Sequence, residues 1–230
     1  MALSNLSKKK QMCIYMEEFE LIIIGSGPGG YHGALRASQY GLKVALIEKE
    51  LLGGTCSNVG CIPTKALQGT AVLLQEIKDK AEPFGLKIQQ PVTVDFAQAV
   101  KRKNDVVNNL RDGIDGLLKR RKIPTYFGAG FIESGNHEDG FVVKITPVGN
   151  PNLTEETRIK GKYVIIATGS IPASFPHFNV DHKRILDSND ILHPDFAIVP
   201  KSIVFVGGGV IGTEFANIFA SVGSKVTIME

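Results

Sequence analysis

The chain has 230 residues, a formal net charge of +3 and 21% charged residues, the profile of an ordinary globular protein. The basic residues are scattered and give no indication of a nucleic-acid partner. The longest apolar runs are too short to cross a bilayer and no signal-peptide segment is recognisable, so we expect no membrane anchor and a cytoplasmic location. Residues 1–16 are expected to be a flexible tail.

A first βαβ unit is predicted directly after this tail. An apolar run over residues 20–24 leads into Gly25-Ser26-Gly27-Pro28-Gly29-Gly30, then a helix-like segment, then a run over 43–47 that ends at Glu48. A strand, a G-x-G-x-x-G turn opening a helix, and a glutamate about 20 residues later form a Rossmann fingerprint. Gly25 permits the tight turn, Gly27 lets a pyrophosphate approach the backbone, and Gly30 lets helix pack on strand. Glu48 would accept hydrogen bonds from a ribose. The alternative is that the glycines serve only as turns.

A cysteine pair follows this unit within residues 53–65. Cys56 and Cys61 are flanked by glycines and lie five positions apart. The lack of a secretory signal argues against a structural disulfide framework, and a pair without clustered histidines argues against zinc, so no metal site is predicted. A redox dithiol is favoured, and a nearby helix start is expected to lower a thiol pKa. Two buried or incidental cysteines are the alternative.

The middle of the chain predicts packing elements. Residues 64–80 and 95–121 have apolar positions at helical spacing and indicate core-facing amphipathic helices. Short strands are predicted over 125–132, 141–146 and 163–167, with a polar loop around 149–151. Prolines between 172 and 200 indicate a domain boundary between about residues 171 and 201.

A second βαβ unit closes the sequence. A strand over 202–206 leads into a glycine-rich turn, a helix through Val222 and a strand over 225–229 that ends at Glu230. Gly207, Gly209 and Gly212 take the three fingerprint roles. Glu230 would accept a ribose 2′-hydroxyl and repel a 2′-phosphate, which favours NAD over NADP. Two dinucleotide sites indicate two cofactors, for which a flavin and a nicotinamide are the natural pair.

The expected fold is therefore α/β. A Rossmann-like FAD-binding domain with the redox disulfide is predicted over residues 17–170. A linker and the first part of a Rossmann-like NAD-binding domain are predicted over residues 171–230.

These motifs, taken in order over residues 19–230, closely resemble the pyridine-nucleotide disulfide oxidoreductases. The Gly128-Ala129-Gly130 turn and the Ala167-Thr168-Gly169-Ser170 strand end extend the resemblance. It implies that Cys56 exchanges with the substrate disulfide and that Cys61 lies beside the flavin. It further implies FAD contacts at Gly25, Gly27, Gly30, Glu48, Lys49, Gly54, Thr55, Lys65, Gly130, Thr168, Gly169 and Ser170, and NAD contacts at Gly207, Gly209, Gly212, Glu214 and Glu230.

Within the family, residues 62–67 look more like the dihydrolipoyl dehydrogenases than the glutathione reductases, although Ser57 and Thr64 depart mildly from the commonest dehydrogenase pattern. That branch reoxidises dihydrolipoamide carried on a lipoyl-domain protein of a 2-oxoacid dehydrogenase or glycine cleavage complex, and full-length members are homodimers. Alternatives are a related FAD disulfide or mercuric reductase, and a non-catalytic truncated nucleotide-binding paralogue. Family members continue for roughly as many residues again, so the chain is expected to match the N-terminal half and to have weak or absent lipoamide activity alone.

Overall fold

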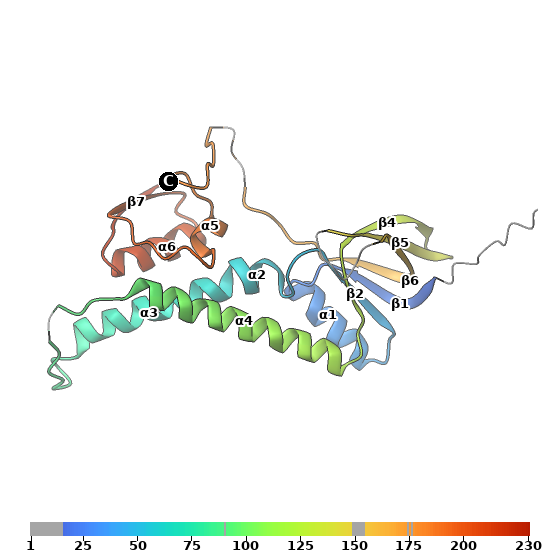
Figure 1. Ribbon diagram of the computed structural model, residues 1–230, viewed down its shortest axis with the longest axis horizontal. Coiled ribbons are helices and arrows are strands. Elements are labelled where there is room, and N and C mark those ends of the chain that lie inside the picture. Colours follow the sequence, from blue (N-terminus) through green and yellow to red (C-terminus); the bar gives the residue numbers. More distant parts are fainter. Residues whose placement is uncertain (1–15, 90, 149–154, 174, 176) are drawn as a thin grey trace, which may run out of the picture.

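The computed structural model describes residues 16–89, 91–148, 155–173, 175 and 177–230 (Figure 1). Nearly all of the expected tail, including Cys13, and the expected loop around 149–151 lie outside the described residues. The α/β class is confirmed: a sheet dominated by parallel pairing is flanked by helices.

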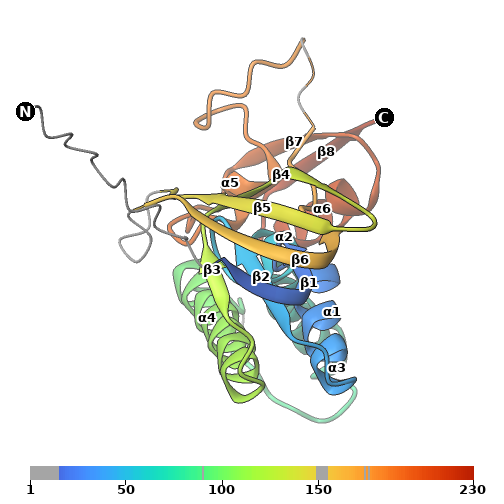
Figure 2. The same cartoon turned by 90° about the vertical axis from the view of Figure 1, so that its right-hand side faces the viewer.

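The main sheet has six strands in the order β3-β2-β1-β6-β5-β4 (Figure 2). The strands β3, β2, β1 and β6 are parallel to their neighbours in this group. The strands β5 and β4 extend the sheet with antiparallel pairing. The central strand carries Ile22 and Ile23, both fully buried, as expected for a strand covered on both faces. The bounds are β1 Glu17–Ile24, β2 Val44–Glu48, β3 Thr125–Phe127, β4 Ala129–Asn136, β5 Gly140–Thr146 and β6 Thr157–Ile166.

Two long helices form an arm that runs away from this sheet (Figure 1). They are α3 (Cys61–Lys80) and α4 (Phe96–Arg120), and α4 begins at Asp95, whose side chain accepts the N–H of Gln98 at 3.0 Å. The shorter helices α1 (Pro28–Gln39) and α2 (Gly54–Val59) lie near the sheet. No helix in the described part of the chain is long and apolar enough to cross a membrane.

The second βαβ unit packs on the arm, over α3. It consists of β7 (Ser202–Val206), α6 (Val210–Ser221) and β8 (Lys225–Met229), preceded by the short α5 (Ser188–Leu192). One buried cluster joins this unit to the arm, because Phe215 and Phe219 of α6 share it with Leu67 and Ala71 of α3. The second unit is therefore held on the arm by apolar packing.

Several predicted bounds need correction. The strand expected over 125–132 is two strands, because the N–H of Gly128 turns to the carbonyl of Glu48 at 2.8 Å and β4 then pairs with β5. The helix expected from residue 64 begins at Cys61. Helices α2 and α5 were not predicted, since each is held by side-chain contacts rather than by apolar periodicity: Asn58 donates to the carbonyls of Leu52 and Gly54, and Asp187 with Asp190 forms a capping box on α5.

Candidate functional site

In the first glycine-rich turn, two of the three fingerprint glycines have no room for a side chain and the third has room. Gly25 has a φ of 101°, and a Cβ there would overlap the carbonyl oxygen of Ala167. A Cβ at Gly30 would overlap the carbonyl oxygen of Gly25. A Cβ at Gly27 would meet nothing closer than the Cα of Gly54 at 4.0 Å, and no side chain caps this end of α1. An open backbone at a helix N-terminus is a fitting place for a pyrophosphate.

Glu48 is a buried carboxylate at the carboxyl end of β2, with 7% of its surface exposed. One oxygen accepts the backbone N–H of Ser26 at 2.9 Å and its hydroxyl at 2.6 Å, and the other accepts the N–H of Glu50 at 2.8 Å. The predicted ribose acceptor is thus fixed beside the glycine-rich turn. Ser26 was not singled out from the sequence, and its place inside the glycine motif was the available signal.

Other predicted flavin contacts gather at the same edge of the sheet. Gly54 has a φ of 59°, and a Cβ there would lie 2.7 Å from the Cα of Gly27, so the start of α2 rests on the first turn. The Cα of Thr168 is 3.1 Å from a Cβ placed on Gly25, which brings in the segment with Gly169 and Ser170. Gly130 lies against the side chains of Ile24 and Ile47, at the ends of β1 and β2. In contrast, Lys49 pairs with Glu50 at 3.1 Å, and no described contact joins it to this group.

Cys56 and Cys61 lie on either side of the junction between α2 and α3, and both are free thiols. Gly60 makes the junction, because a Cβ there would press against the carbonyl oxygen of Thr55 at 2.9 Å. Burial, followed by the hydrogen bond and charge of Cys61, raises the pKa of Cys56 to about 11. The predicted lowering of a thiol pKa is wrong for Cys56 in the reduced pair, since a neighbouring thiol disfavours a second negative charge.

Burial, followed by the charge of Cys56, raises the pKa of Tyr31 of α1. Tyr31 was not singled out from the sequence. Its position directly after Gly30 is the sequence feature that could have indicated a place near the site.

Lys65 of α3 and Glu214 of α6 form an ion pair between the arm and the second βαβ unit. Lys65 lies one helical turn beyond Cys61, and the side chains of the pair are 55% and 25% exposed. From the sequence, Lys65 is predicted to contact the flavin and Glu214 to contact NAD. The structure brings the two together.

The second glycine-rich turn repeats the geometry of the first. Gly207 has a φ of 107°, and a Cβ at Gly212 would overlap the carbonyl oxygen of Gly207. Gly209 precedes α6, and a Cβ there would meet nothing within 4 Å. The Glu230 carboxylate accepts the N–H of Gly208. The backbone therefore leaves room for a second pyrophosphate.

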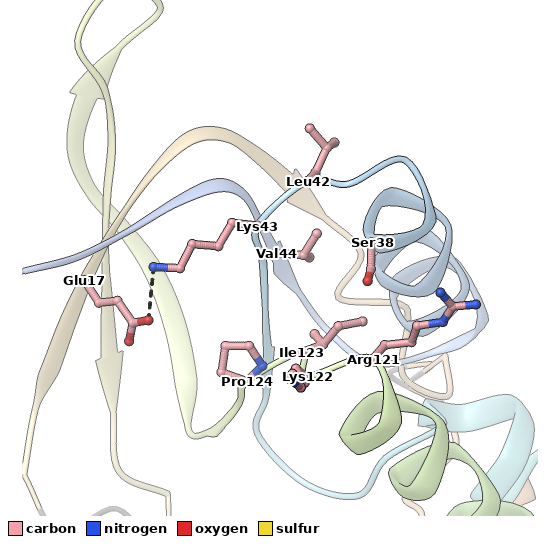
Figure 3. A pocket seen from close by; sticks show the side chains of 9 residues that line it. All are labelled: Glu17, Ser38, Leu42, Lys43, Val44, Arg121, Lys122, Ile123 and Pro124. Atoms are coloured by element: carbon pink, nitrogen blue, oxygen red, sulfur yellow. Dashed lines mark ion pairs between the residues drawn. The ribbon is translucent and has the colours of Figure 1, made fainter.

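A pocket of about 320 Å³ lies at the opposite end of the main sheet (Figure 3). Its lining includes Glu17 and Val44, which begin β1 and β2, and Pro124, which precedes β3. Lys43 and Glu17 form an ion pair of 3.3 Å on one side of it. Dinucleotides bind at the carboxyl ends of parallel strands, so this pocket is separate from the glycine-rich edge.

Known proteins match this chain over nearly its whole length. A family model described as pyridine nucleotide-disulphide oxidoreductase matches residues 19–230. A dihydrolipoyl dehydrogenase of Acholeplasma laidlawii is 42% identical over 218 residues, which are 93% of this chain and 60% of that protein. The dihydrolipoyl dehydrogenase of Bacillus subtilis (strain 168) is 41% identical over 213 residues, 93% of this chain and 44% of that protein. The chain thus spans only part of the length of these relatives.

Solved structures agree with the fold. A Cu(II) complex of the HOCl-induced flavoprotein disulfide reductase RclA from Escherichia coli has a TM-score of 0.74 at 32% identity, covering 94% of this chain and 43% of that one. LpdA from Mycobacterium tuberculosis has a TM-score of 0.80 at 22% identity, covering 93% and 44%, and this likeness supports the fold alone.

Proposed function

Because the chain belongs to the pyridine nucleotide-disulphide oxidoreductase family, we propose that it is the flavin-binding part of a dihydrolipoyl dehydrogenase. The observation that carries the proposal is the Cys56–Cys61 pair at the α2–α3 junction, where α2 also rests on the open first glycine turn. In this proposal residues 17–170 form the FAD-binding domain, and residues 171–230 form a linker and the first part of the NAD-binding domain.

The chain's residues divide between two cofactors. Gly25, Gly27 and Gly30 would admit the FAD pyrophosphate, with Glu48 on its ribose. Gly207, Gly209 and Gly212 would admit the pyrophosphate of NAD, with Glu230 on its ribose. When bound, FAD supplies the two-electron chemistry that connects the dithiol to NAD. The remaining FAD contacts proposed are Lys49, Gly54, Thr55, Lys65, Gly130, Thr168, Gly169 and Ser170, and Glu214 is proposed to contact NAD.

The cysteines would perform thiol–disulfide exchange. A dihydrolipoamide thiolate attacks Sγ of Cys56 in the oxidised pair, the bond to Cys61 breaks, and Cys61 leaves as a thiolate. The second lipoyl thiolate then attacks the lipoyl sulfur of the mixed disulfide and releases Cys56, so the lipoyl group loses two electrons and the pair gains them. Because its pKa in the reduced pair is raised to about 11, Cys56 takes up a proton on release.

The partner would be dihydrolipoamide on a lipoyl-domain protein of a 2-oxoacid dehydrogenase or glycine cleavage complex. The parent enzyme would be a cytoplasmic homodimer. A second candidate is a flavoprotein disulfide reductase with another substrate, which the 32% identity to RclA favours.

Thiol counting tests the proposed exchange. The chain, oxidised at Cys56 and Cys61, is treated with dihydrolipoamide or with glutathione, and the new thiols are labelled and located by peptide mass spectrometry. We expect dihydrolipoamide to release both thiols faster than glutathione does, and Cys56→Ser to abolish the reaction. Equal rates for the two reductants would favour the second candidate, and no release with either would overturn the proposal.

A further inference from the structure

Lys103 of α4 is a buried cation that lies in neither glycine-rich turn. Only 1% of its surface is exposed, which is rare for a lysine. Its Nζ donates to the carbonyl oxygens of Leu192 at 2.7 Å and His193 at 3.1 Å. The next residue of α4, Asn104, donates to the carbonyl of Pro194 at 2.9 Å. Three consecutive carbonyls at the end of α5 are therefore held by two adjacent side chains of α4.

These carbonyls belong to the segment that leads into the second βαβ unit. Leu192 ends α5, and a helix end leaves its last carbonyls without intrahelical partners. Lys103 supplies a partner for the carbonyl of Leu192, and Lys103 and Asn104 bind the two carbonyls that follow the helix. The side chains of Ile191 and Leu192 enter the same buried cluster as Phe215 and Phe219 of α6. The contact thus lies where α6 is held against the arm.

The part of α4 that carries Lys103 is also tied to α3. Arg102, beside Lys103, donates to the carbonyl of Ala66 on α3 at 3.0 Å, which ties α4 to the helix that begins with Cys61. Across α3, Lys65 meets Glu214 of α6. A displaced α5 segment would move α6 and separate this ion pair.

Burial disfavours the charged form of Lys103. Burial lowers its pKa from 10.5 to about 8, and the opposing influence of Asp195, whose own neighbour is His193 at 3.8 Å, offsets this only in part. A buried charge of this kind costs folding free energy that an apolar side chain of similar length would not. What an apolar side chain cannot do is select the carbonyls at the end of α5 as its partners.

We infer that Lys103 is a positioning residue that fixes the second βαβ unit on the α3–α4 arm and so holds Glu214 against Lys65. With the proposed function, on which this consequence rests, Lys103 sets the distance between the flavin and nicotinamide sites. The positioning itself needs no cofactor, so it can be tested apart from flavin binding.

The test is zero-length coupling of the ion pair in the cofactor-free chain at pH 7. A carboxyl-activating reagent forms an amide bond between Lys65 and Glu214, and the reagent takes up the water that is lost. The cross-linked peptide is then measured by mass spectrometry. Lys80 and Glu76, an ion pair of 2.9 Å within α3, provide the internal standard. In Lys103→Met the two hydrogen bonds of the Lys103 ammonium group are lost. We therefore expect the yield of the Lys65–Glu214 cross-linked peptide to fall about tenfold. The matched control is Lys101→Met, on the exposed side of the same helix, which should leave it unchanged.

Thermal unfolding of the same variants separates positioning from general stability. Because removal of the buried charge offsets the loss of the two hydrogen bonds, we expect Lys103→Met to keep its melting temperature while losing the coupling. Unchanged coupling in Lys103→Met would overturn the inference. If that variant does not fold, the wild-type chain in rising urea decides: Lys103 should become reactive to acetylation in the same step in which the coupling is lost. Acetylation of Lys103 while the coupling persists would overturn the inference, whether or not the chain binds flavin.

Discussion

Lys65 and Glu214 lie 149 residues apart in the sequence and form an ion pair between α3 and α6. Lys65 belongs to the helix that begins with Cys61, and Glu214 belongs to the helix that follows the second glycine-rich turn. The pair therefore joins the helix that begins with Cys61 to the second βαβ unit, where NAD is proposed to bind. Because the ion pair is partly exposed, it contributes little to the folding free energy. Its importance is that it connects α3 to α6.

Replacing Gly27 should separate flavin binding from folding. A Cβ at this position meets no atom closer than 4.0 Å, so Gly27→Ala should fold with a nearly unchanged melting temperature. The methyl group would occupy the space proposed for the pyrophosphate, and FAD affinity should fall on the order of a hundredfold, or about 3 kcal/mol. Fluorescence titration with FAD measures the effect.

The matched variant is Gly30→Ala. Its Cβ would overlap the carbonyl oxygen of Gly25, so the turn must shift and the chain should lose stability on the order of 3 kcal/mol. Unaltered FAD affinity in Gly27→Ala would show that the first turn holds no pyrophosphate.

The second turn permits the same comparison for NAD. A Cβ at Gly209 meets nothing within 4 Å, whereas one at Gly212 would overlap the carbonyl oxygen of Gly207. Gly209→Ala should therefore weaken NAD binding without loss of stability, and Gly212→Ala should destabilise the second unit. Calorimetric titration and thermal unfolding measure the two effects. If Gly209→Ala binds NAD as the parent chain does, the assignment of this turn is wrong.

Removing the Cys61 side chain should make Cys56 more reactive. Burial, then the hydrogen bond and charge of Cys61, raise the Cys56 pKa from 9.0 to about 11, and Cys61→Ala removes the last two causes. Each unit by which the pKa falls gives about tenfold more thiolate near pH 8, so alkylation of Cys56 by iodoacetamide should accelerate. The rate is followed from pH 7 to 11 in the reduced chain. An unchanged pH profile would show that the two thiols are not coupled.

Lys103 should give the chain a specific alkaline stability profile. Its pKa is 10.5 when exposed and about 8 in the folded chain, so between these values the unfolded chain binds more protons and stability rises with pH. The rise is on the order of 3 kcal/mol at most. Cys56 acts in the opposite direction, because its stabilising effect is lost as pH rises from 9.0 towards 11. Because Cys56 is present in both chains, its effect cancels when wild type is compared with Lys103→Met. The free energy of unfolding is measured in urea as a function of pH, and equal profiles for the two chains would contradict the assignment.

Local patterns were enough to predict both glycine-rich units and the placement of the cysteine pair at a helix start. Each depends on residues close in sequence, such as Gly25 with Gly30, or Cys56 with Cys61. The ion pair of Lys65 and Glu214 could not be predicted, because it depends on how α6 packs on α3.

Burial and tertiary contacts explain the other features that the sequence did not predict. Lys103 lies at helical spacing between the buried Ala99 and Val107, so its position on the core-facing side of α4 could be read from the sequence. Its partners, the carbonyls that end α5, could not, because they depend on how α5 packs on the arm. The raised pKa of Cys56 likewise follows from burial and from the second thiol, neither of which a helix-start argument includes. Short helices such as α2 depend on individual side chains, here Asn58, and give no periodic signal.

The most direct test of the central claim is the visible absorbance spectrum of the chain mixed with FAD and freed of excess, before and after addition of dihydrolipoamide. We expect a bound-flavin spectrum that gains a long-wavelength band on reduction, and no such band in Cys61→Ala. A protein that stays colourless after incubation with FAD, or a bound flavin that dihydrolipoamide leaves unchanged, would contradict the claim that this chain holds FAD beside a Cys56–Cys61 redox pair.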